Sequence, residues 1–486
     1  MVDPILIGKG QHHVYLLPSY ANRHGLIAGA TGTGKTVTLQ VLAEGFSRRG
    51  VPVFTADVKG DVSGISQAGR SHPKIDERIR TIGITDFAFE GMPTIFWDLW
   101  GREGHPIRTT VSEMGPLLLS RLLNLNETQE GVLNIAFEVA DDEGMLLLDL
   151  KDLRALLQYI GEQRKSLSLE YGHISTASVG AIQRRLLVLE QQGGEHFFGE
   201  PAFEITNFMR TTSDGKGYIN ILAADRLMQN PRLYSTFLLW LLAELFEELP
   251  EVGDLDKPRM VFFFDEAHLL FSDAPKALLE KIEQVVKLIR SKGVGIFFVT
   301  QNPMDIPDSV LAQLGNRIQH ALRAYTPRER KAVRAAAQAF RPNPAFETGE
   351  MITQLGVGEA LVSSLDSKGA PSMVECTLIC PPRSRIGPAT NDERHQLIQQ
   401  SPFYGKYEDP IDRESAYEVL RKRAEKRIAE AEEAKEVQAK AKRRGRMSLG
   451  ESVVRSVVRS VAIMVVGRVV RSVLGNFLRP SRRRRR

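Results

Sequence analysis

The sequence predicts an α/β protein of the P-loop NTPase class, with helices on both faces of a mainly parallel central sheet. Two observations indicate this class. A glycine-rich loop of the form G-x-x-x-x-G-K-[ST] spans Gly29–Thr36, between an apolar run and a helical segment. Several later apolar runs end in polar residues, as strands buried in a parallel sheet do. With 486 residues, the chain also has room for an insertion and a C-terminal region.

The loop supplies the first half of a predicted ATP site. Its glycines let successive backbone N–H groups point at a phosphate, and the next helix adds the positive end of its dipole. Lys35 is expected to reach the β- and γ-phosphates, and the Thr36 hydroxyl to bind Mg²⁺. A plain glycine-rich turn is the alternative. The predicted nucleotide-binding residues are Gly29, Ala30, Thr31, Gly32, Thr33, Gly34, Lys35 and Thr36.

Two short extended pieces before the loop, Ile5–Gly10 and Val14–Pro18, predict a lead-in hairpin. His12, His13 and His24 lie in this region. No carboxylate or cysteine accompanies them at the spacing of a metal site, so we interpret them as polar surface residues.

The strand expected after the first helix, Val51–Asp57, ends in a carboxylate. Acidic residues at the carboxyl ends of parallel strands face the crevice where ligands bind. Asp57 is therefore a candidate for the second shell of the magnesium ion or for contact with the attacking water. A turn cap before Gly60 is an equally good interpretation.

The middle of the chain changes to helical patterns with no strong strand signal, which predicts an all-α insertion. The sheet is expected to resume with a strand over Lys216–Asp225. A helix over Tyr234–Leu249 follows and should be buried. The predicted parts are the first half of the ATPase core at residues 1–97, the insertion at 98–210, the second half of the core at 211–382, a linker and charged helix at 383–446, and a basic tail at 447–486.

A continuous apolar strand, Arg259–Phe264, is followed by two adjacent carboxylates. Asp265 is predicted to hold Mg²⁺, directly or through water. Glu266 is predicted to activate the water that attacks the γ-phosphate. A helix-capping Asp with Glu266 in the first turn is the alternative for this pair alone, but the upstream loop favours nucleotide hydrolysis.

The next apolar strand ends in Gln301, which we expect to hold the water or sense the γ-phosphate. A helix over Ala277–Ser291 precedes this strand. Further strands are expected at Arg317–Ala324 and in a closing hairpin of Glu359–Ser363 with Met373–Ile379.

Charge is distributed unevenly along the chain. Residues 421–486 contain 21 Lys and Arg against 6 Asp and Glu, a net charge of +15, which leaves −10 for residues 1–420. In the tail, valines and arginines alternate on opposite sides of a predicted basic amphipathic helix. Such a helix suits an anionic membrane surface, a helical bundle with its copies or another protein partner, or nucleic acid. A disordered, solubilising tail is the alternative.

We expect a cytoplasmic protein. Met1–Lys9 has neither the basic nor the apolar region of a signal peptide, and the apolar run Val461–Val466 is far too short to cross a membrane. The two cysteines, Cys376 and Cys380, allow no disulfide framework and are interpreted as small core residues.

The order of these motifs resembles the HerA/FtsK superfamily of P-loop ATPases, most closely the HerA-like bacterial proteins. The resemblance implies a RecA-like fold and a hexameric ring that moves DNA. It also implies that Arg290, which precedes the Gly-Val-Gly strand, reaches the nucleotide of the neighbouring subunit; Arg317 and Arg323 are weaker candidates for such a role. An arginine placed by the helix dipole is the alternative for Arg290.

Two functional hypotheses follow. The first is an ATP-hydrolysing motor that translocates or unwinds DNA. The second is a remodelling ATPase that acts on a protein or a membrane and has no DNA substrate. A small-molecule kinase is disfavoured because Glu266 beside Asp265 suits the activation of water. A scaffold that does not hydrolyse ATP remains as a further alternative.

Overall fold

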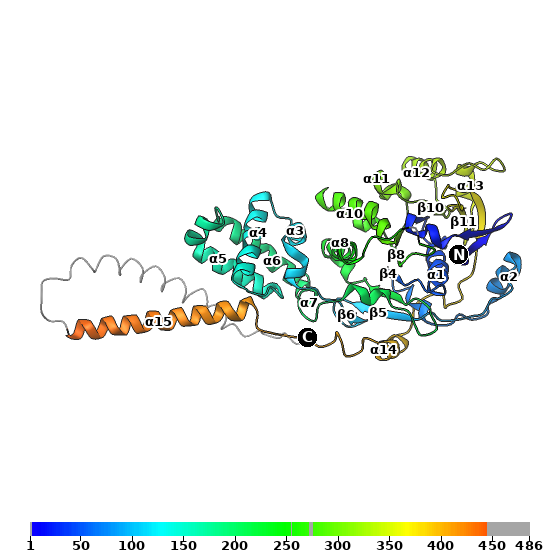
Figure 1. The fold of residues 1–486 in the computed structure, drawn as a ribbon. Helices are drawn as coiled ribbons and strands as arrows, with labels where there is room; N and C mark the ends of the chain where they lie inside the picture. Colours follow the sequence, from blue (N-terminus) through cyan, green and yellow to red (C-terminus); the bar gives the residue numbers. More distant parts are fainter. Residues whose placement is uncertain (1, 254, 272–275, 445–486) are drawn as a thin grey trace.

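The computed structural model describes residues 2–253, 255–271 and 276–444 (Figure 1). Its strands form a single 12-stranded sheet, ordered β2-β1-β12-β11-β10-β3-β9-β8-β4-β7-β5-β6. The predicted basic tail at 447–486 lies outside the described residues. The strands are β1 Ile5–Lys9, β2 His13–Leu16, β3 Gly25–Ala28, β4 Val53–Asp57, β5 Thr94–Asp98, β6 His105–Pro106, β7 Ile219–Ala223, β8 Met260–Phe264, β9 Val294–Thr300, β10 Asn316–Gln319, β11 Glu359–Ser363 and β12 Glu375–Ile379.

The sheet is mainly parallel, which confirms the predicted class. Strands from β10 to β6 in the sheet order all run parallel, while β11, β12, β1 and β2 extend the sheet with antiparallel pairs. Both predicted hairpins are present, and β1 pairs with β12 to join them. The strand predicted at Arg317–Ala324 is shorter, ending at Gln319. At the centre, β3, β9, β8 and β4 lie side by side, so their carboxyl ends meet at one edge.

Alternate residues of the central strands face two separate cores. Phe263 of β8 packs with the helix α1, Lys35–Ser47, on one face, whereas Phe262 and Phe264 join the core on the other face. This alternation is the period-two pattern of a strand covered on both sides. The second face carries α8, Pro231–Glu248, whose apolar surface is buried as expected.

Seven further helices belong to the described part of the chain around the sheet, among them α10, which packs beside α8. They are α2 Pro73–Ile82, α9 His268–Phe271, α10 Lys276–Leu288, α11 Asp308–Leu311, α12 Pro327–Gln338, α13 Thr348–Gln354 and α14 Asn391–Gln400.

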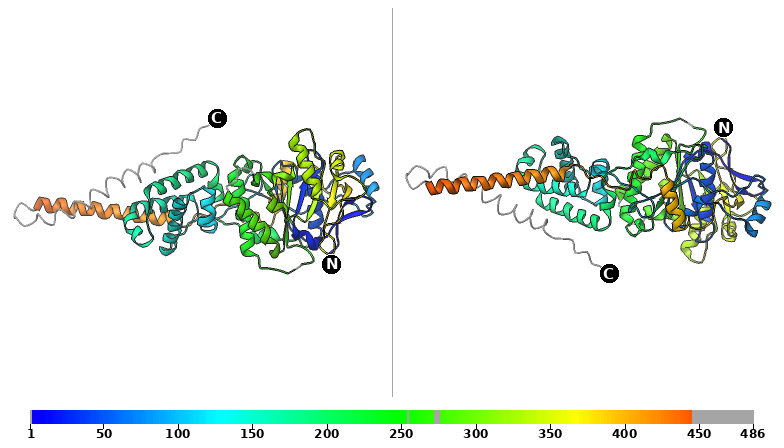
Figure 2. Two further views of the ribbon diagram at one scale, coloured as in Figure 1. Left: turned by 90° about the horizontal axis from the view of Figure 1, so that it is seen from above. Right: turned by 90° about the horizontal axis from the view of Figure 1, so that it is seen from below.

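Consecutive helices between β6 and β7 form a separate lobe at one end of the molecule (Figures 1 and 2). Their presence matches the predicted helical character of this stretch, although β6 also falls within it. The domain boundaries themselves remain predictions. The helices of this lobe are α3 Val111–Leu122, α4 Glu127–Asp142, α5 Leu150–Glu170, α6 Thr176–Gln191 and α7 Gly194–Phe197.

The segment after β12 returns along the sheet toward the helical lobe. Arg394 of α14 lies over the ring of Phe96, 4.8 Å from its centroid. Farther on, Phe403 packs against Trp97 of β5 with ring centroids 5.3 Å apart. The helix α15, Ala416–Arg444, then lies along α5, and its Arg423 pairs with Glu143 at the end of α4. The first part of the predicted linker is therefore packed onto the core.

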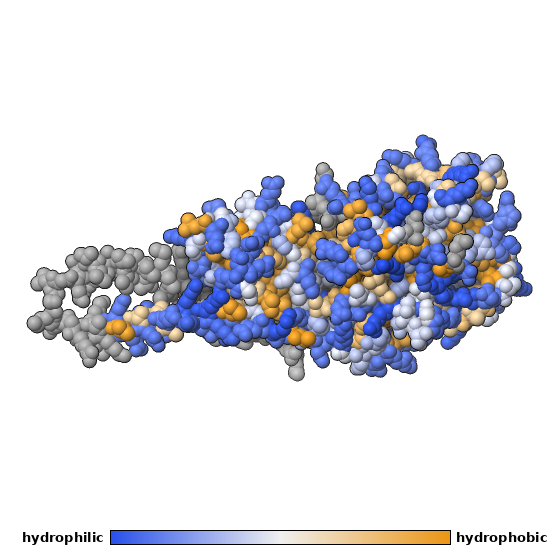
Figure 3. Space-filling view, viewed as in Figure 1, coloured by the Kyte–Doolittle hydropathy of each residue, from blue (hydrophilic) through white to orange (hydrophobic). Residues whose placement is uncertain are grey.

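The visible surface is covered mainly by hydrophilic side chains with apolar residues scattered among them (Figure 3). Over the part of the chain that the structure describes, no helix has an apolar stretch long enough to cross a bilayer. Cys380 is buried, Cys376 is partly buried, and both are free thiols.

The interpretation of His24 as a surface residue was wrong. The side chain is buried and its backbone has a φ of 56°. Its Nε2 lies 2.8 Å from the carbonyl oxygen of Val286, and its Nδ1 accepts a hydrogen bond from the Ile296 N–H at 3.0 Å. The imidazole thus joins the end of α10 to β9, whereas His12 and His13 are exposed as expected.

Candidate nucleotide-binding site

The glycine-rich loop connects β3 to α1, as predicted. Gly32 and Gly34 have φ values of 79° and 113°, which residues with a side chain rarely adopt. Lys35 folds back over the loop, and its Nζ donates hydrogen bonds to the carbonyl oxygens of Gly29 at 2.7 Å and Ala30 at 3.0 Å. Thr31 and Thr33 complete the turn between them. The loop thus places the N-terminal end of α1 beyond the carboxyl end of β3.

His320, just beyond β10, packs against the glycine-rich loop. It was not predicted as part of the site. Its Nε2 lies 2.9 Å from the Thr38 hydroxyl, and its Nδ1 lies 2.9 Å from the Glu359 carbonyl oxygen. A Cβ added to Gly29 would come within 2.5 Å of the His320 Cβ. Burial lowers the pKa of His320 to about 4, so the imidazole is neutral. The only sequence signal was a histidine in the middle of the strand predicted at Arg317–Ala324.

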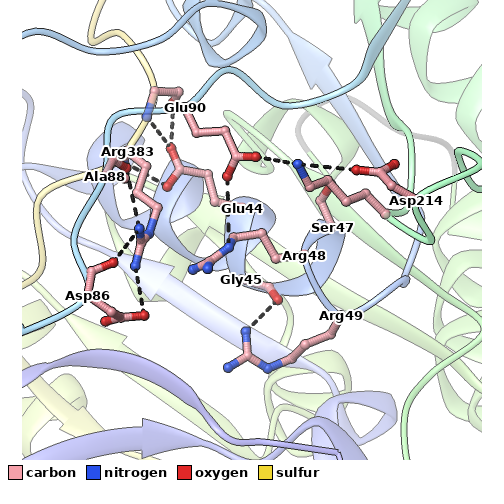
Figure 4. Close-up of polar contacts among 12 residues, drawn as sticks. Glu44, Gly45, Ser47, Arg48, Arg49, Asp86, Ala88, Glu90, Asp214 and Arg383 are labelled. Carbon is pink, nitrogen blue, oxygen red and sulfur yellow. Dashed lines mark hydrogen bonds and ion pairs between the residues drawn. The ribbon is translucent and has the colours of Figure 1, made fainter.

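The far end of α1 is anchored to the segment after β12 (Figure 4). The buried carboxylate of Glu44 accepts hydrogen bonds from the backbone N–H groups of Arg383 at 2.8 Å and Ser384 at 2.9 Å. Burial raises the pKa of Glu44. This helix, which carries Lys35 and Thr36 at its first turn, is therefore fixed at both ends.

Asp265 and Glu266 follow β8 directly, and both side chains are buried. Glu266 has a φ of 47°, a left-handed conformation that is strained for a residue with a side chain and is typical of functional sites. Asp265 Oδ1 accepts a hydrogen bond from the Glu266 N–H at 2.8 Å. Burial and the neighbouring Glu266 raise the pKa of Asp265 to about 6.

Donors surround the Glu266 carboxylate. Lys59, from the turn after β4, forms an ion pair with Oε1. Gln301 Nε2, after β9, lies 3.3 Å from Oε1 and 3.2 Å from Oε2. Burial alone would raise the pKa of Glu266, but the bonds from Lys59 and Gln301 outweigh it and lower the pKa. The structure thus brings Gln301 to Glu266, as the strand order suggests.

Asp57 takes the turn-cap position that the sequence left as an alternative. Its carboxylate accepts hydrogen bonds from the backbone N–H groups of Gly60 at 2.8 Å and Val62 at 3.2 Å. Asp61, four residues later, faces the loop instead, and its Oδ2 accepts a hydrogen bond from the Thr36 hydroxyl at 3.3 Å. The sequence shows that a second carboxylate is present, but it does not predict the shape of the turn that directs this carboxylate toward Thr36.

These residues fit a magnesium-bound nucleotide. Space at Gly32 is open, because a Cβ placed there would meet no atom within 4 Å. Asp61 Oδ1 is buried and has no hydrogen-bond partner among the residues that the structure describes. Among the described residues no three His, Cys, Asp or Glu side chains form a metal site, but magnesium in P-loop proteins takes a hydroxyl, a carboxylate and phosphate oxygens. Thr36, Asp265 and Asp61 offer such oxygens.

Arg290 is not part of this cluster. It is exposed in the 3₁₀ turn Ile289–Lys292, before β9, whereas Gln301 follows the other end of that strand. A strand of 7 residues separates the two by at least about 20 Å. Arg317 is tied to loop carbonyls, with Nε 3.2 Å from the Leu314 oxygen. Arg323 is exposed beyond β10.

A family model described as "Helicase HerA-like C-terminal" matches residues 5–485. The chain belongs to the HerA-like helicase C-terminal family. Together with the α/β sheet, this match confirms the resemblance drawn from the motifs.

Other proteins resemble this HerA-like chain over parts of their length or in fold. "Probable helicase MJECL08" of Methanocaldococcus jannaschii is 31% identical over 120 residues, which is 24% of this chain and about a fifth (21%) of that protein. VirB4 of Thermoanaerobacter pseudethanolicus has a TM-score of 0.51 at 16% identity, covering 80% of this chain and 97% of that one. The bacterial conjugative coupling protein TrwBdeltaN70 has a TM-score of 0.50 at 15% identity, covering 79% and 90%. At these identities the two structures show a shared fold.

Proposed function

We propose that this HerA-like protein is a magnesium-dependent ATPase that works in the cytoplasm as a motor on DNA. The observation that supports it best is the meeting of Lys35, Glu266 and Gln301 at the carboxyl ends of three adjacent strands, β3, β8 and β9. A nucleophilic water, its base and the phosphate-binding lysine are needed together for hydrolysis.

In this proposal each residue has a defined task. The backbone N–H groups of Gly29–Thr36 and the Lys35 ammonium bind the phosphates. Thr36 and Asp265 hold the magnesium ion, which supplies charge neutralisation when bound. Glu266 takes a proton from the attacking water, and the Gln301 amide orients that water. Asp57 supports this edge of the site by fixing the turn that carries Asp61.

We further propose that the active form is a ring, with the hexamer implied by the family resemblance. Arg290 is exposed and lies at the opposite end of β9 from the cluster, so it cannot serve the nucleotide of its own subunit. A guanidinium from the next subunit would neutralise charge on the γ-phosphoryl group and couple hydrolysis to assembly.

A cationic face on α12 favours DNA as the substrate. Its exposed cations form no ion pair with a carboxylate among the described residues, although residues 1–420 carry a net charge of −10. The apolar side of α12 packs inward through Ala332, Val333 and Ala336. Unpaired cations on a rigid helix suit phosphate contacts. The exposed cations of α12 are Arg328, Arg330, Lys331 and Arg334, and the exposed Arg323 and Arg341 precede and follow the helix in the chain.

The second candidate is a remodelling ATPase that acts on an anionic membrane or a protein and not on DNA. The net charge of +15 on residues 421–486 favours this alternative, because such a segment is attracted to anionic lipid.

One set of ATPase assays separates the two candidates. Full-length protein and a variant ending at residue 444 are each assayed alone, with duplex DNA, with single-stranded DNA and with anionic liposomes. A DNA motor should hydrolyse ATP faster with DNA, even without the tail, since α12 remains. An unchanged rate with DNA, together with tail-dependent binding to liposomes, would favour the second candidate.

A further inference from the structure

Lys59 restrains the residue that we propose as the catalytic base. Its Nζ pairs with Oε1 of Glu266, while the Gln301 amide donates to Oε1 at 3.3 Å and to Oε2 at 3.2 Å. Both oxygens of the carboxylate therefore face donors. A general base needs an oxygen that is free to accept a proton from water. In this arrangement Glu266 is not ready to accept a proton from water.

Lys59 also lies among the other carboxylates of the site. Burial alone would lower its pKa, but the hydrogen bond to Glu266 and the charges of Glu266, Asp265 and Asp61 outweigh burial and raise the pKa. The ammonium group is thus paired with Glu266 and attracted by Asp265 and Asp61, where we propose that magnesium binds.

The Lys59 side chain is free to leave without disturbing the fold. It is 49% exposed, whereas the Glu266 side chain is 6% exposed. The backbone of the turn is fixed separately by Asp57, which accepts hydrogen bonds from Gly60 and Val62. Only the flexible four-carbon stem of Lys59 has to move.

We propose that Lys59 is a positioning residue that stands in for the metal ion, holding Glu266 inactive until magnesium and nucleotide displace it. Lys59 would be repelled by a divalent cation at Thr36 and Asp265 and attracted toward the phosphates or solvent. Glu266 would then regain a free oxygen. This inference rests on the proposed function and concerns the regulation of the same site.

Binding of ADP at increasing magnesium concentrations tests the inference without depending on turnover. Wild type has to break the Lys59–Glu266 ion pair, so Lys59→Met should bind magnesium and ADP about two- to fivefold more tightly, the value of one partly exposed pair. Lys59→Arg keeps the pair and should match wild type. The increase in affinity caused by Lys59→Met should be smaller in a Glu266→Gln background, where the negative charge that pairs with Lys59 is already absent.

Lys151→Met is the matched control. Lys151 also lies near three carboxylates, at 3.6 Å from Asp149, 3.0 Å from Asp412 and 3.7 Å from Glu418, and its side chain is 39% exposed. It belongs to α5 in the helical lobe, so its loss should leave ADP binding unchanged.

Thermal unfolding checks that each variant is folded and gives a second measure. Without ligand, Lys59→Met should melt below wild type, and magnesium with ADP should raise its Tm by more. Equal or weaker binding by Lys59→Met, with wild type binding normally, would overturn this inference alone. A wild-type protein that does not bind magnesium and ADP would overturn the proposed function as well.

Discussion

At the scale of single residues, the site depends on a strained glutamate and a lysine that lies across its own loop. The left-handed φ of 47° at Glu266 places its carboxylate beside Gln301 rather than on the axis of β8. Lys35 occupies the loop through the carbonyl oxygens of Gly29 and Ala30. A bound nucleotide would replace the hydrogen bonds from Lys35 to the loop. The strained backbone of Glu266 is of the kind that functional sites retain.

Lys35→Ala should strongly weaken nucleotide binding, because it removes the ammonium group that we propose binds the phosphates. A titration with a fluorescent ATP analogue would measure this, and affinity should fall by about 10- to 150-fold, the effect of removing a charge-assisted hydrogen bond. Lys74→Ala, an exposed lysine on α2, is the control. Similar affinities for the two variants would contradict the assignment of the loop.

The buried His24 predicts a loss of stability in acid. Burial lowers its pKa from 6.5 to about 4, so above pH 6.5 its full contribution is present. As the pH falls toward 4, the unfolded chain binds a proton that the folded chain does not. The free energy of unfolding should then decrease by up to about 1.4 kcal/mol per pH unit for this group.

His24→Asn should flatten that dependence, since asparagine tolerates a positive φ and does not titrate. Urea unfolding of both proteins between pH 6.5 and about 4 would measure the difference. The same slope in variant and wild type would show that His24 titrates normally in the folded chain.

At the scale of secondary structure, the elements that could be predicted were those with a long apolar run or a recognisable motif. The long apolar runs of β8 and β9 were recognised because their residues are buried on all sides, and the loop before α1 was recognised by its motif. β5 was missed, since Thr94–Asp98 is short and runs directly into a polar turn. The sequence could not predict that Asp61, and not Asp57, contacts Thr36, because this depends on the backbone path of the turn between the two residues. His320 reaches the loop only through the pairing of β10 with β3.

The cationic face of α12 gives a prediction at this scale. Arg330→Gln with Arg334→Gln should weaken duplex DNA binding and reduce the slope of affinity against salt concentration by about two, one for each phosphate that is no longer neutralised. Fluorescence anisotropy at several salt concentrations would measure it. The matched control removes two exposed cations from α5, Arg164→Gln with Lys165→Gln. An equally large reduction in both variants would argue against a specific role for α12.

At the scale of the whole molecule, the sheet places the phosphate loop, Glu266 and Gln301 at the carboxyl ends of its central strands, and Arg290 at the opposite edge. Arg290→Ala should therefore bind ATP normally and hydrolyse it at least about 1,000-fold more slowly, the effect of a missing trans arginine. Mixing it with Lys35→Ala should restore part of the activity, because some interfaces then pair an intact site with an intact arginine. No recovery on mixing would contradict a shared site.

The most direct test compares ATP binding and hydrolysis by wild type and Glu266→Gln, with and without duplex DNA. The glutamine keeps the size of the side chain but cannot accept the proton of the attacking water. The account predicts that both proteins bind ATP, that DNA raises the wild-type rate, and that Glu266→Gln hydrolyses ATP at least about 100-fold more slowly. Equal hydrolysis by the two proteins, or binding without turnover in wild type, would contradict it.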